Sequence, residues 1–224
     1  MTLPTPPHRI LTPGLTGTLR GFYYAAAAIA AAAVFALINE ARAFDTWSGP
    51  GGGGTLSALA RAEESRSAIE GFLGLATLVI VVLTIIWWYQ AARAIEHTTT
   101  AGRTWTPGWA IGGWFIPFAN LVIPKLVLNQ IDRVSGAADE GTTEWKERRV
   151  MSIIHAWWVF WLAAVLLRGF GIVIAAAQLA PGAILDPVAY ASALKLQVVG
   201  MGAIAVAALF AAASLRVLGN RLHR

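Results

Sequence analysis

The sequence predicts an all-α integral membrane protein with four transmembrane helices and one broken segment between the second and the third. Hydrophobic residues make up 57% of the 224-residue chain and charged residues only 13%. A soluble domain carries about 25% charged residues, so this chain has too little polar surface to be one. Four apolar stretches are long enough to cross a hydrocarbon core of about 30 Å, which takes about 20 helical residues. The length fits a single domain.

The first half of the chain predicts two spans. Residues 1–20 contain four prolines, and we expect them to form a flexible cytoplasmic tail. A first span follows at about residues 21–40, and the glycine-rich stretch 49–54 separates it from the next helix. The stretch Leu56–Glu70 has helical composition and should run without interruption into a second span at about residues 72–90.

The second half predicts two more spans, at about residues 153–177 and 195–215, within a single membrane domain 21–217. A short basic cytoplasmic tail, residues 218–224, ends the chain. The first and fourth spans are crowded with Ala and Gly, which let helix backbones approach closely in lipid. The second span is rich in Val, Ile and Leu. We therefore expect the first and fourth spans to form the packed centre and the second to face lipid.

The broken segment, residues 107–134, is apolar but carries Pro117, Pro124 and three glycines. Proline lacks a backbone donor and glycine weakens a helix, so an unbroken spanning helix is not expected here. Backbone without helical hydrogen bonds must be buried in protein or line a wet cavity when it lies in a membrane. We therefore expect a re-entrant or interfacial segment in which Ile116–Pro124 packs against other spans. The Asn120 side chain would then bond the freed backbone groups.

Beyond Pro124 the pattern predicts an amphipathic helix lying in the interface plane. Its apolar side would carry Leu126, Val127, Ile131 and Val134, opposite Lys125, Asn129, Asp132 and Arg133. Two interpretations of the broken segment stay open: a pocket for a ligand or lipid, or a wedge that anchors the cytoplasmic face. The residues that would carry either role are Trp109, Trp114, Pro117, Asn120, Pro124 and Lys125.

Basic residues predict the orientation. If the broken segment does not cross the membrane, twelve Lys and Arg lie on the side of both termini and four on the other. Lys and Arg favour the cytoplasmic face, so both termini should be cytoplasmic, in the bacterial inner membrane. A five-span arrangement divides these residues ten against five and stays open as the alternative.

A family resemblance rests on a set of short motifs around the broken segment. They are Trp87-Trp88-Tyr89, Arg93, Pro107-Gly108-Trp109, Trp114-Phe115-Ile116-Pro117, Ala119-Asn120-Leu121 and Pro124. In these the chain resembles a bacterial membrane family, found mainly in actinobacteria and catalogued as domain of unknown function 4328. Family members often have an arginine-rich stretch where this chain has Gln90-Ala91-Ala92, and Trp where it has Asp132. The resemblance implies a multi-span membrane protein and supplies no activity.

Arg168 is the most unusual charged residue, because it lies inside the third span, about 15 Å by helical rise from its outer end. A charge inside a membrane is costly and by default indicates a function or a partner. We expect it to pair with Glu40 at the end of the first span or Glu70 at the start of the second. Snorkelling to the outer headgroups and a role in transport or ligand binding are the alternatives.

The sequence offers little for catalysis, metals or cofactors. The chain has no cysteine, its histidines do not share metal-ligand spacing, and no nucleophile-elbow or phosphate-loop motif is present. We therefore predict no catalytic residues, no metal, no cofactor and no enzyme activity. The net charge of +5 comes from residues that flank the spans, so nucleic acid is not an expected partner.

These observations predict a protein that works within the lipid bilayer. The leading hypothesis is a non-enzymatic scaffold or accessory subunit, which would bind a membrane protein partner or form a homo-oligomer. Its contact surfaces would be the Ala/Gly-rich spans and the polar region 129–152. The alternative is a small-molecule or lipid-binding or transport protein that uses a pocket at the Pro117–Pro124 break.

Overall fold

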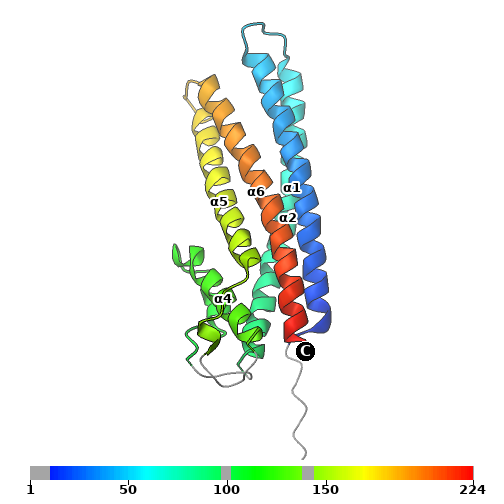
Figure 1. Ribbon diagram of the computed structural model, residues 1–224. Coiled ribbons are helices and arrows are strands. Elements are labelled where there is room, and N and C mark those ends of the chain that lie inside the picture. Colours follow the sequence, from blue (N-terminus) through cyan, green and yellow to red (C-terminus); the bar gives the residue numbers. More distant parts are fainter. Residues whose placement is uncertain (1–10, 97–101, 138–143, 224) are drawn as a thin grey trace, which may run out of the picture. The chain divides into compact units, whose positions relative to one another are not determined.

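The chain is helical throughout the residues that the computed structural model describes, which are 11–96, 102–137 and 144–223. No β-strand occurs among them. The described residues form six α-helices and two short 3₁₀-helices, labelled η here; the long helices can be followed in Figure 1. They are α1 (Pro13–Ser48), α2 (Leu56–Ala94), α3 (Trp109–Gly112), η1 (Ala119–Leu121), α4 (Ile123–Ser135), η2 (Glu144–Lys146), α5 (Ser152–Gln178) and α6 (Pro187–Leu222).

Four helices in the described part of the chain, α1, α2, α5 and α6, are long and apolar enough to span a membrane. This confirms the all-helical class and the prediction of four helices suited to spanning a membrane. Their lengths of 36, 39, 27 and 36 residues correspond to about 54, 58, 40 and 54 Å at 1.5 Å per residue. The predicted spans are therefore the apolar middle parts of longer helices. Helix α2 runs unbroken from Leu56, as expected.

The terminal tails are shorter than the sequence predicted. Helix α1 begins at Pro13 and α6 continues to Leu222, so residues 13–20 and 218–222 are helical. Residues 1–10, the rest of the predicted tail, lie outside the described part. Proline fits the first turn of a helix because its missing N–H has no intrahelical partner there. Composition did not reveal that the ends of α1 and α6 pack together.

Tertiary contacts hold these helix ends in place. The Trp87 indole Nε1 donates a hydrogen bond of 2.9 Å to the Thr16 hydroxyl. Gly219 lies so close to Thr16 that an added Cβ would be 2.6 Å from the threonine Cγ2. Leu19 and Leu218 are completely buried. Helical structure at both ends therefore depends on contacts between distant parts of the chain.

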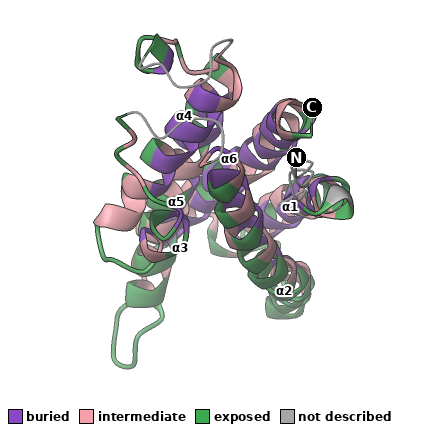
Figure 2. Ribbon diagram, turned by 90° about the horizontal axis from the view of Figure 1, so that it is seen from below, coloured by how far each residue is buried: buried purple, intermediate pink, exposed green. Residues whose placement is uncertain are grey.

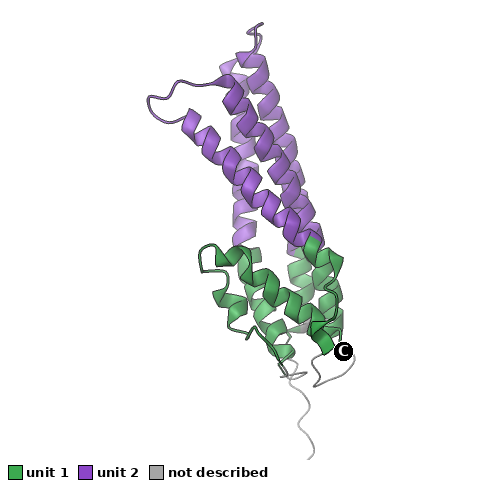
Figure 3. Ribbon diagram, turned by 60° about the vertical axis from the view of Figure 1, so that its left-hand side comes forward, with its two compact units in different colours: residues 1–21, 79–155, 211–224 green, residues 22–78, 156–210 purple. Residues whose placement is uncertain are grey.

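The chain divides into two compact units, shown in Figure 3. Unit 1 comprises residues 1–21, 79–155 and 211–224, and unit 2 comprises residues 22–78 and 156–210. The core of unit 1 contains large side chains, among them Trp87, Trp88, Ile131, Trp145 and Leu218. Figure 2 shows α4 as one of its mostly buried helices.

The core of unit 2 is built largely from alanines of α1 and α6. The buried ones are Ala26, Ala27, Ala30, Ala33, Ala36, Ala193, Ala203, Ala207 and Ala208. In the most apolar windows, 50% of the α6 residues and 33% of the α1 residues are buried, against 17% for α2 and 11% for α5. This order confirms that the Ala-rich first and fourth spans pack more deeply than the second.

Two glycines bring α5 and α6 close together in unit 2. A Cβ at Gly171 would lie 2.8 Å from the Ala193 carbonyl oxygen, and a Cβ at Gly200 would lie 2.7 Å from the Arg168 backbone nitrogen. Neither neighbour can rotate away, because both are backbone atoms. The contact fixes the backbone of Arg168 against α6.

This close approach predicts opposite effects at two glycines of α6. Gly200→Ala forces the Arg168 backbone to shift and should lower the free energy of unfolding by roughly 1–3 kcal/mol. Gly202→Ala is the matched control, because a Cβ there meets nothing within 4 Å. It should be neutral or stabilising by about 0.5–1 kcal/mol, since alanine favours a helix over glycine. Thermal unfolding in detergent measures both, and equal effects would contradict the predicted contact.

Candidate functional site

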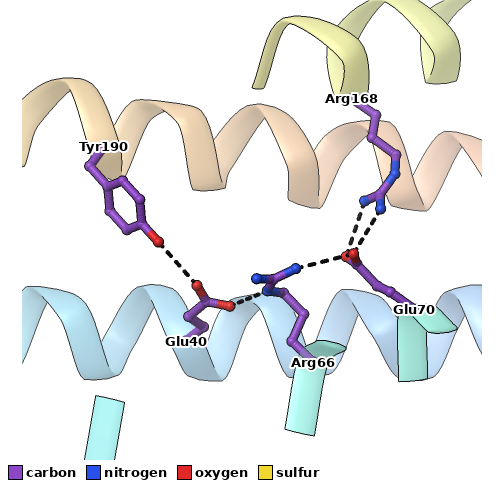
Figure 4. Close-up of polar contacts among 5 residues, drawn as sticks. All are labelled: Glu40, Arg66, Glu70, Arg168 and Tyr190. Atoms are coloured by element: carbon purple, nitrogen blue, oxygen red, sulfur yellow. Dashed lines mark hydrogen bonds and ion pairs between the residues drawn. The ribbon is translucent and has the colours of Figure 1, made fainter. Parts of the chain in front are cut away.

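Five side chains from the four long helices meet in unit 2 and form what we term the charge cluster (Figure 4). Helix α1 contributes Glu40, α2 contributes Arg66 and Glu70, α5 contributes Arg168, and α6 contributes Tyr190. The side chains of the four charged members are only 1% to 21% exposed, so little of each is open to solvent. Its members must therefore satisfy one another.

Arg168 binds Glu70 through two parallel hydrogen bonds. Its Nη1 lies 3.1 Å from Glu70 Oε1 and its Nη2 lies 2.8 Å from Oε2. Two-point pairing of a guanidinium with a carboxylate is among the strongest polar contacts in proteins. Of the two partners that the sequence offered for Arg168, the structure pairs it with Glu70.

Glu40, the other offered partner, is instead bound to Arg66 and Tyr190. Its side chain is only 1% exposed. It accepts a hydrogen bond from Arg66 Nε, and the Tyr190 hydroxyl lies 3.4 Å from its second oxygen. Arg66 Nη1 also donates to Glu70 Oε2 at 3.1 Å. Arg66 thus joins the two carboxylates into one chain of contacts.

Sequence reasoning missed two members of this cluster. It did not single out Arg66, whose side chain is mostly buried. The four-residue spacing between Arg66 and Glu70 was a usable signal, because such residues are neighbours on one helix face. Tyr190 lies 150 residues from Glu40, and no local pattern indicates that contact.

The cluster is electrically balanced, with two carboxylates and two guanidiniums that each have a partner of opposite charge. Removing charges from water is costly, and a buried pair recovers that cost only with good geometry and further hydrogen bonds. The cluster meets both conditions. It therefore links α1, α2 and α5, with Tyr190 adding α6, and holds these four helices in one arrangement.

The broken segment is held in place by contacts with other residues of unit 1. The Gln130 side chain accepts hydrogen bonds from the Thr104 and Trp105 N–H groups at 3.0 Å and donates to the Trp105 carbonyl at 2.7 Å. Trp114 packs against Trp88 of α2 with 5.3 Å between ring centroids. Trp109 meets Trp105 edge to face at 5.6 Å.

The expectation that Ile116–Pro124 packs against other spans is wrong for its first part. Pro124 is buried, but Ile116, Pro117 and Phe118 are exposed, with Phe118 86% exposed. Among the described residues, the Asn120 side chain makes no hydrogen bond to a freed carbonyl. Its backbone N–H donates instead to the Ile116 carbonyl at 2.9 Å, and the Leu121 N–H donates to the Phe118 carbonyl at 3.1 Å. Short local turns satisfy the backbone, so burial is not required.

Helix α4 also differs from its predicted arrangement. Val127, Ile131 and Val134 are buried within the protein, while Leu126 from the same predicted side is partly exposed. Lys125 is half-buried. The amphipathic pattern was correct for these three residues, but it does not say whether lipid or protein covers the apolar side.

Asp132 is the clearest departure from the predicted polar face of α4. Its side chain is 1% exposed and accepts a hydrogen bond of 2.8 Å from the Met151 N–H. Its other oxygen binds Arg221 Nη1 at 2.7 Å. Gln90 belongs to the stretch Gln90-Ala91-Ala92, where the resembled family often has arginines. Its side chain accepts a hydrogen bond from the Thr12 N–H at 3.0 Å. Both departures thus carry contacts between distant parts of the chain.

No group of three or more potential ligands that could hold a metal occurs in the described part of the chain. The polar groups that come together are ion pairs and hydrogen bonds between helices. Chemically, these contacts join helices to one another.

These features define a helical membrane-type protein with four potential spans, a neutral charge cluster in one unit and a broken segment in the other. The family model described as Domain of unknown function (DUF4328) matches residues 54–219. The chain belongs to this family. No curated protein and no solved structure matches it.

The geometry of the cluster predicts unequal costs for breaking its contacts. Glu70→Gln leaves Arg168 without its carboxylate and should lower the free energy of unfolding by about 2–3 kcal/mol. This is less than the roughly 3–5 kcal/mol for a fully buried pair, since both side chains are partly exposed. Arg168→Gln should cost less, because Glu70 keeps Arg66.

The double variant tests whether the two residues act as a pair. Its loss should be smaller than the sum of the two single losses, because neither charge is left alone. Glu64→Gln, an exposed position on the same helix, is the control and should change stability by less than about 0.5 kcal/mol. Denaturation in detergent measures all four proteins, and strict additivity would exclude the pair as a stabilising contact.

Proposed function

We propose that this protein is a multi-pass component of the bacterial cytoplasmic membrane that acts through association, as a scaffold or accessory subunit, without catalysis of its own. Its partner would be another membrane protein or a second copy of the chain. One observation carries this proposal: the charged groups of the charge cluster are paired with one another inside the protein.

Closure of the cluster supports a structural role for its charges. A transport or ligand site for an ion needs a charged group that can exchange its partner during binding. Here Glu70 already receives three guanidinium N–H groups, from Arg66 and from both Nη atoms of Arg168. Exchange would leave an unpaired charge among apolar helices, which is costly.

The distribution of charge supports cytoplasmic termini. The residue ranges of unit 1 contain twelve Lys and Arg and six Asp and Glu, whereas those of unit 2 contain five and six. Positive residues are retained on the cytoplasmic side of bacterial membranes. Unit 1 includes both termini and the broken segment, so all of these would lie at the cytoplasmic face. The broken segment would then enter the membrane from that side and return to it.

The polar region 129–152 supplies a surface for a protein partner. Around η2 the side chains of Glu144, Lys146, Glu147 and Arg149 are exposed, while Trp145 is buried beneath them. Exposed side chains of both charge signs around η2 favour a specific contact with a protein more than a general attraction to anionic lipid. The exposed groups therefore form the proposed partner surface.

The alternative, a small-molecule or lipid-binding protein with a pocket at Pro117–Pro124, needs side chains that converge on a ligand. Pro117 and Phe118 are exposed, so little of the protein surrounds them as a pocket would. This favours association over ligand handling, and the cross-linking experiment below separates the two functions.

The proposed orientation predicts the labelling of two single cysteines, a clean experiment because the chain has none of its own. In spheroplasts, an impermeant maleimide should react with the Gly51→Cys variant, since residues 49–54 would be periplasmic. It should react with the Glu147→Cys variant only after the membrane is opened. The reverse pattern would overturn the orientation.

Association predicts position-specific cross-linking of the full-length protein in its native membrane. A photoreactive amino acid at Lys146 or Glu147 should give one recurring protein adduct, either a dimer of this chain or a conjugate with one partner. The same group at Glu64, exposed in unit 2, serves as the control and should not give that adduct. Adding the Lys146→Glu charge reversal to the Glu147 photoreactive variant should reduce its yield several-fold.

A different outcome would contradict association. If neither position gives a protein adduct and a small molecule copurifies with the chain in mild detergent, the ligand-handling alternative replaces the scaffold.

A further inference from the structure

Exposed large apolar side chains in the described part of unit 1 occur in only two places. One is the C-terminal part of α2, with Val79, Val81, Val82, Ile86 and Tyr89. The other is the broken segment and its continuation into α4, with Trp109, Ile111, Phe115, Ile116, Phe118, Val122 and Leu126. The exposed face of α2 belongs to a helix suited to spanning a membrane. The second group is what needs an explanation.

The four consecutive residues Phe115–Phe118, which we term the apolar tip, are all exposed. Phe115 is 73% and Phe118 is 86% exposed. Such aromatic side chains would be unfavourable in water, because burying apolar area is favourable. Something outside the chain therefore covers them.

Phe118 is also held in an unfavourable backbone conformation. Its φ of +61° and ψ of −39° make it the one non-glycine residue with positive φ among those described. Conformations of this kind persist only when the surroundings impose them, and they gather at functional sites. The backbone turn thus presents the Phe118 ring outward at a cost to local stability.

The base of this turn is rigid. Gln130 fixes Thr104 and Trp105 with three hydrogen bonds. Gly113 lies against Ile123, where an added Cβ would be 2.5 Å from the isoleucine Cγ2. Because both sides of the turn are anchored, the exposure of the apolar tip does not result from a loose loop.

Charge indicates what covers the tip. Residues 104–124 contain no charged side chain, and the basic residues Arg103 and Lys125 stand immediately before and after them. An uncharged stretch flanked by basic residues suits acyl chains beneath anionic headgroups. The segment also packs against α2, because the Trp114 ring contacts the Trp88 ring.

The geometry points to a lipid-inserting tip: Phe115–Phe118 enters one leaflet of the bilayer between acyl chains, while the half-buried Lys125 stays with the phosphates and Arg103 keeps its ion pair with Glu96. The inference rests on the proposed orientation only for the choice of the cytoplasmic leaflet. The tip serves as a fixed second contact with the membrane beside the spans and sets the depth at which unit 1 sits.

Fluorescence quenching of the full-length protein tests this directly. Single cysteines replace Phe118 or Ile116 and carry an environment-sensitive fluorophore, in vesicles of phosphatidylethanolamine and phosphatidylglycerol. We expect quenching by nitroxide lipids to exceed quenching by aqueous iodide several-fold. Nitroxides near the headgroups should act more strongly than those near the chain ends, because the tip does not cross the bilayer.

Two matched positions calibrate the measurement. Val82 is exposed on α2 and should behave as a lipid-facing site, whereas Glu147 is exposed beside η2 and should be quenched by iodide. If labels at 116 and 118 both behave like the label at 147, the inference is wrong. Strongest quenching by deep nitroxides would also overturn it, since the segment would then span the membrane.

A variant of the tip itself provides an independent check. Phe118→Gly removes the ring and relieves the positive φ, so the melting temperature in detergent should stay equal or rise. The label at Ile116 in that background should become at least twofold more accessible to iodide. An unchanged accessibility would contradict a role for Phe118 in holding the tip in lipid.

The outcome is separable from the proposed function. Quenching reports contact between the tip and lipid and requires no protein partner, whereas cross-linking at Lys146 reports association. Failure of the quenching test removes the re-entrant segment but leaves association intact, and failure of the cross-linking test leaves the lipid contact intact.

Discussion

The arrangement of unit 2 depends on one electrostatic constraint: an ionised side chain among apolar helices must find its opposite charge within the protein. Arg168 meets this constraint through two parallel contacts with Glu70, and Arg66 extends the pairing to Glu40. Because the four partners come from three helices, the need to pair charges also positions those helices. Gly200 completes the arrangement, since its missing side chain lets α6 approach the backbone of Arg168.

In unit 1 a similar constraint applies to the polypeptide backbone, whose polar groups also need partners. Two prolines prevent a continuous helix between α2 and α5, and the freed groups need other partners. Short local turns supply partners for several of them, and Gln130 binds the backbone of Thr104 and Trp105 at the base of the segment. With these local hydrogen bonds in place, the apolar side chains of the tip face outward. Rigidity at the base and exposure at the tip are consequences of the same local solution.

The two units therefore differ in what they offer to their surroundings. Unit 2 pairs the charges of its charge cluster internally and presents apolar helix faces, which are suited to lipid. Unit 1 carries an excess of basic residues, a buried Asp132–Arg221 contact and exposed charges around η2. This division is the basis for proposing association through unit 1, because the charge cluster of unit 2 is already paired. It also explains why Arg168, the charge that the sequence singled out, joins two helices.

The sequence by itself determined the helical class, the four apolar helices and the family, because hydropathy, length and local motifs act along the chain. It also indicated the two carboxylates that compete for Arg168. Only the tertiary structure decided that Glu70 is the partner, that Arg66 and Tyr190 join the cluster, and that Asp132 is buried. It likewise decided that the ends of α1 and α6 are helical and that Phe118 is exposed. These outcomes depend on contacts between residues far apart in the chain, and local composition and periodicity carry no information about which distant groups meet.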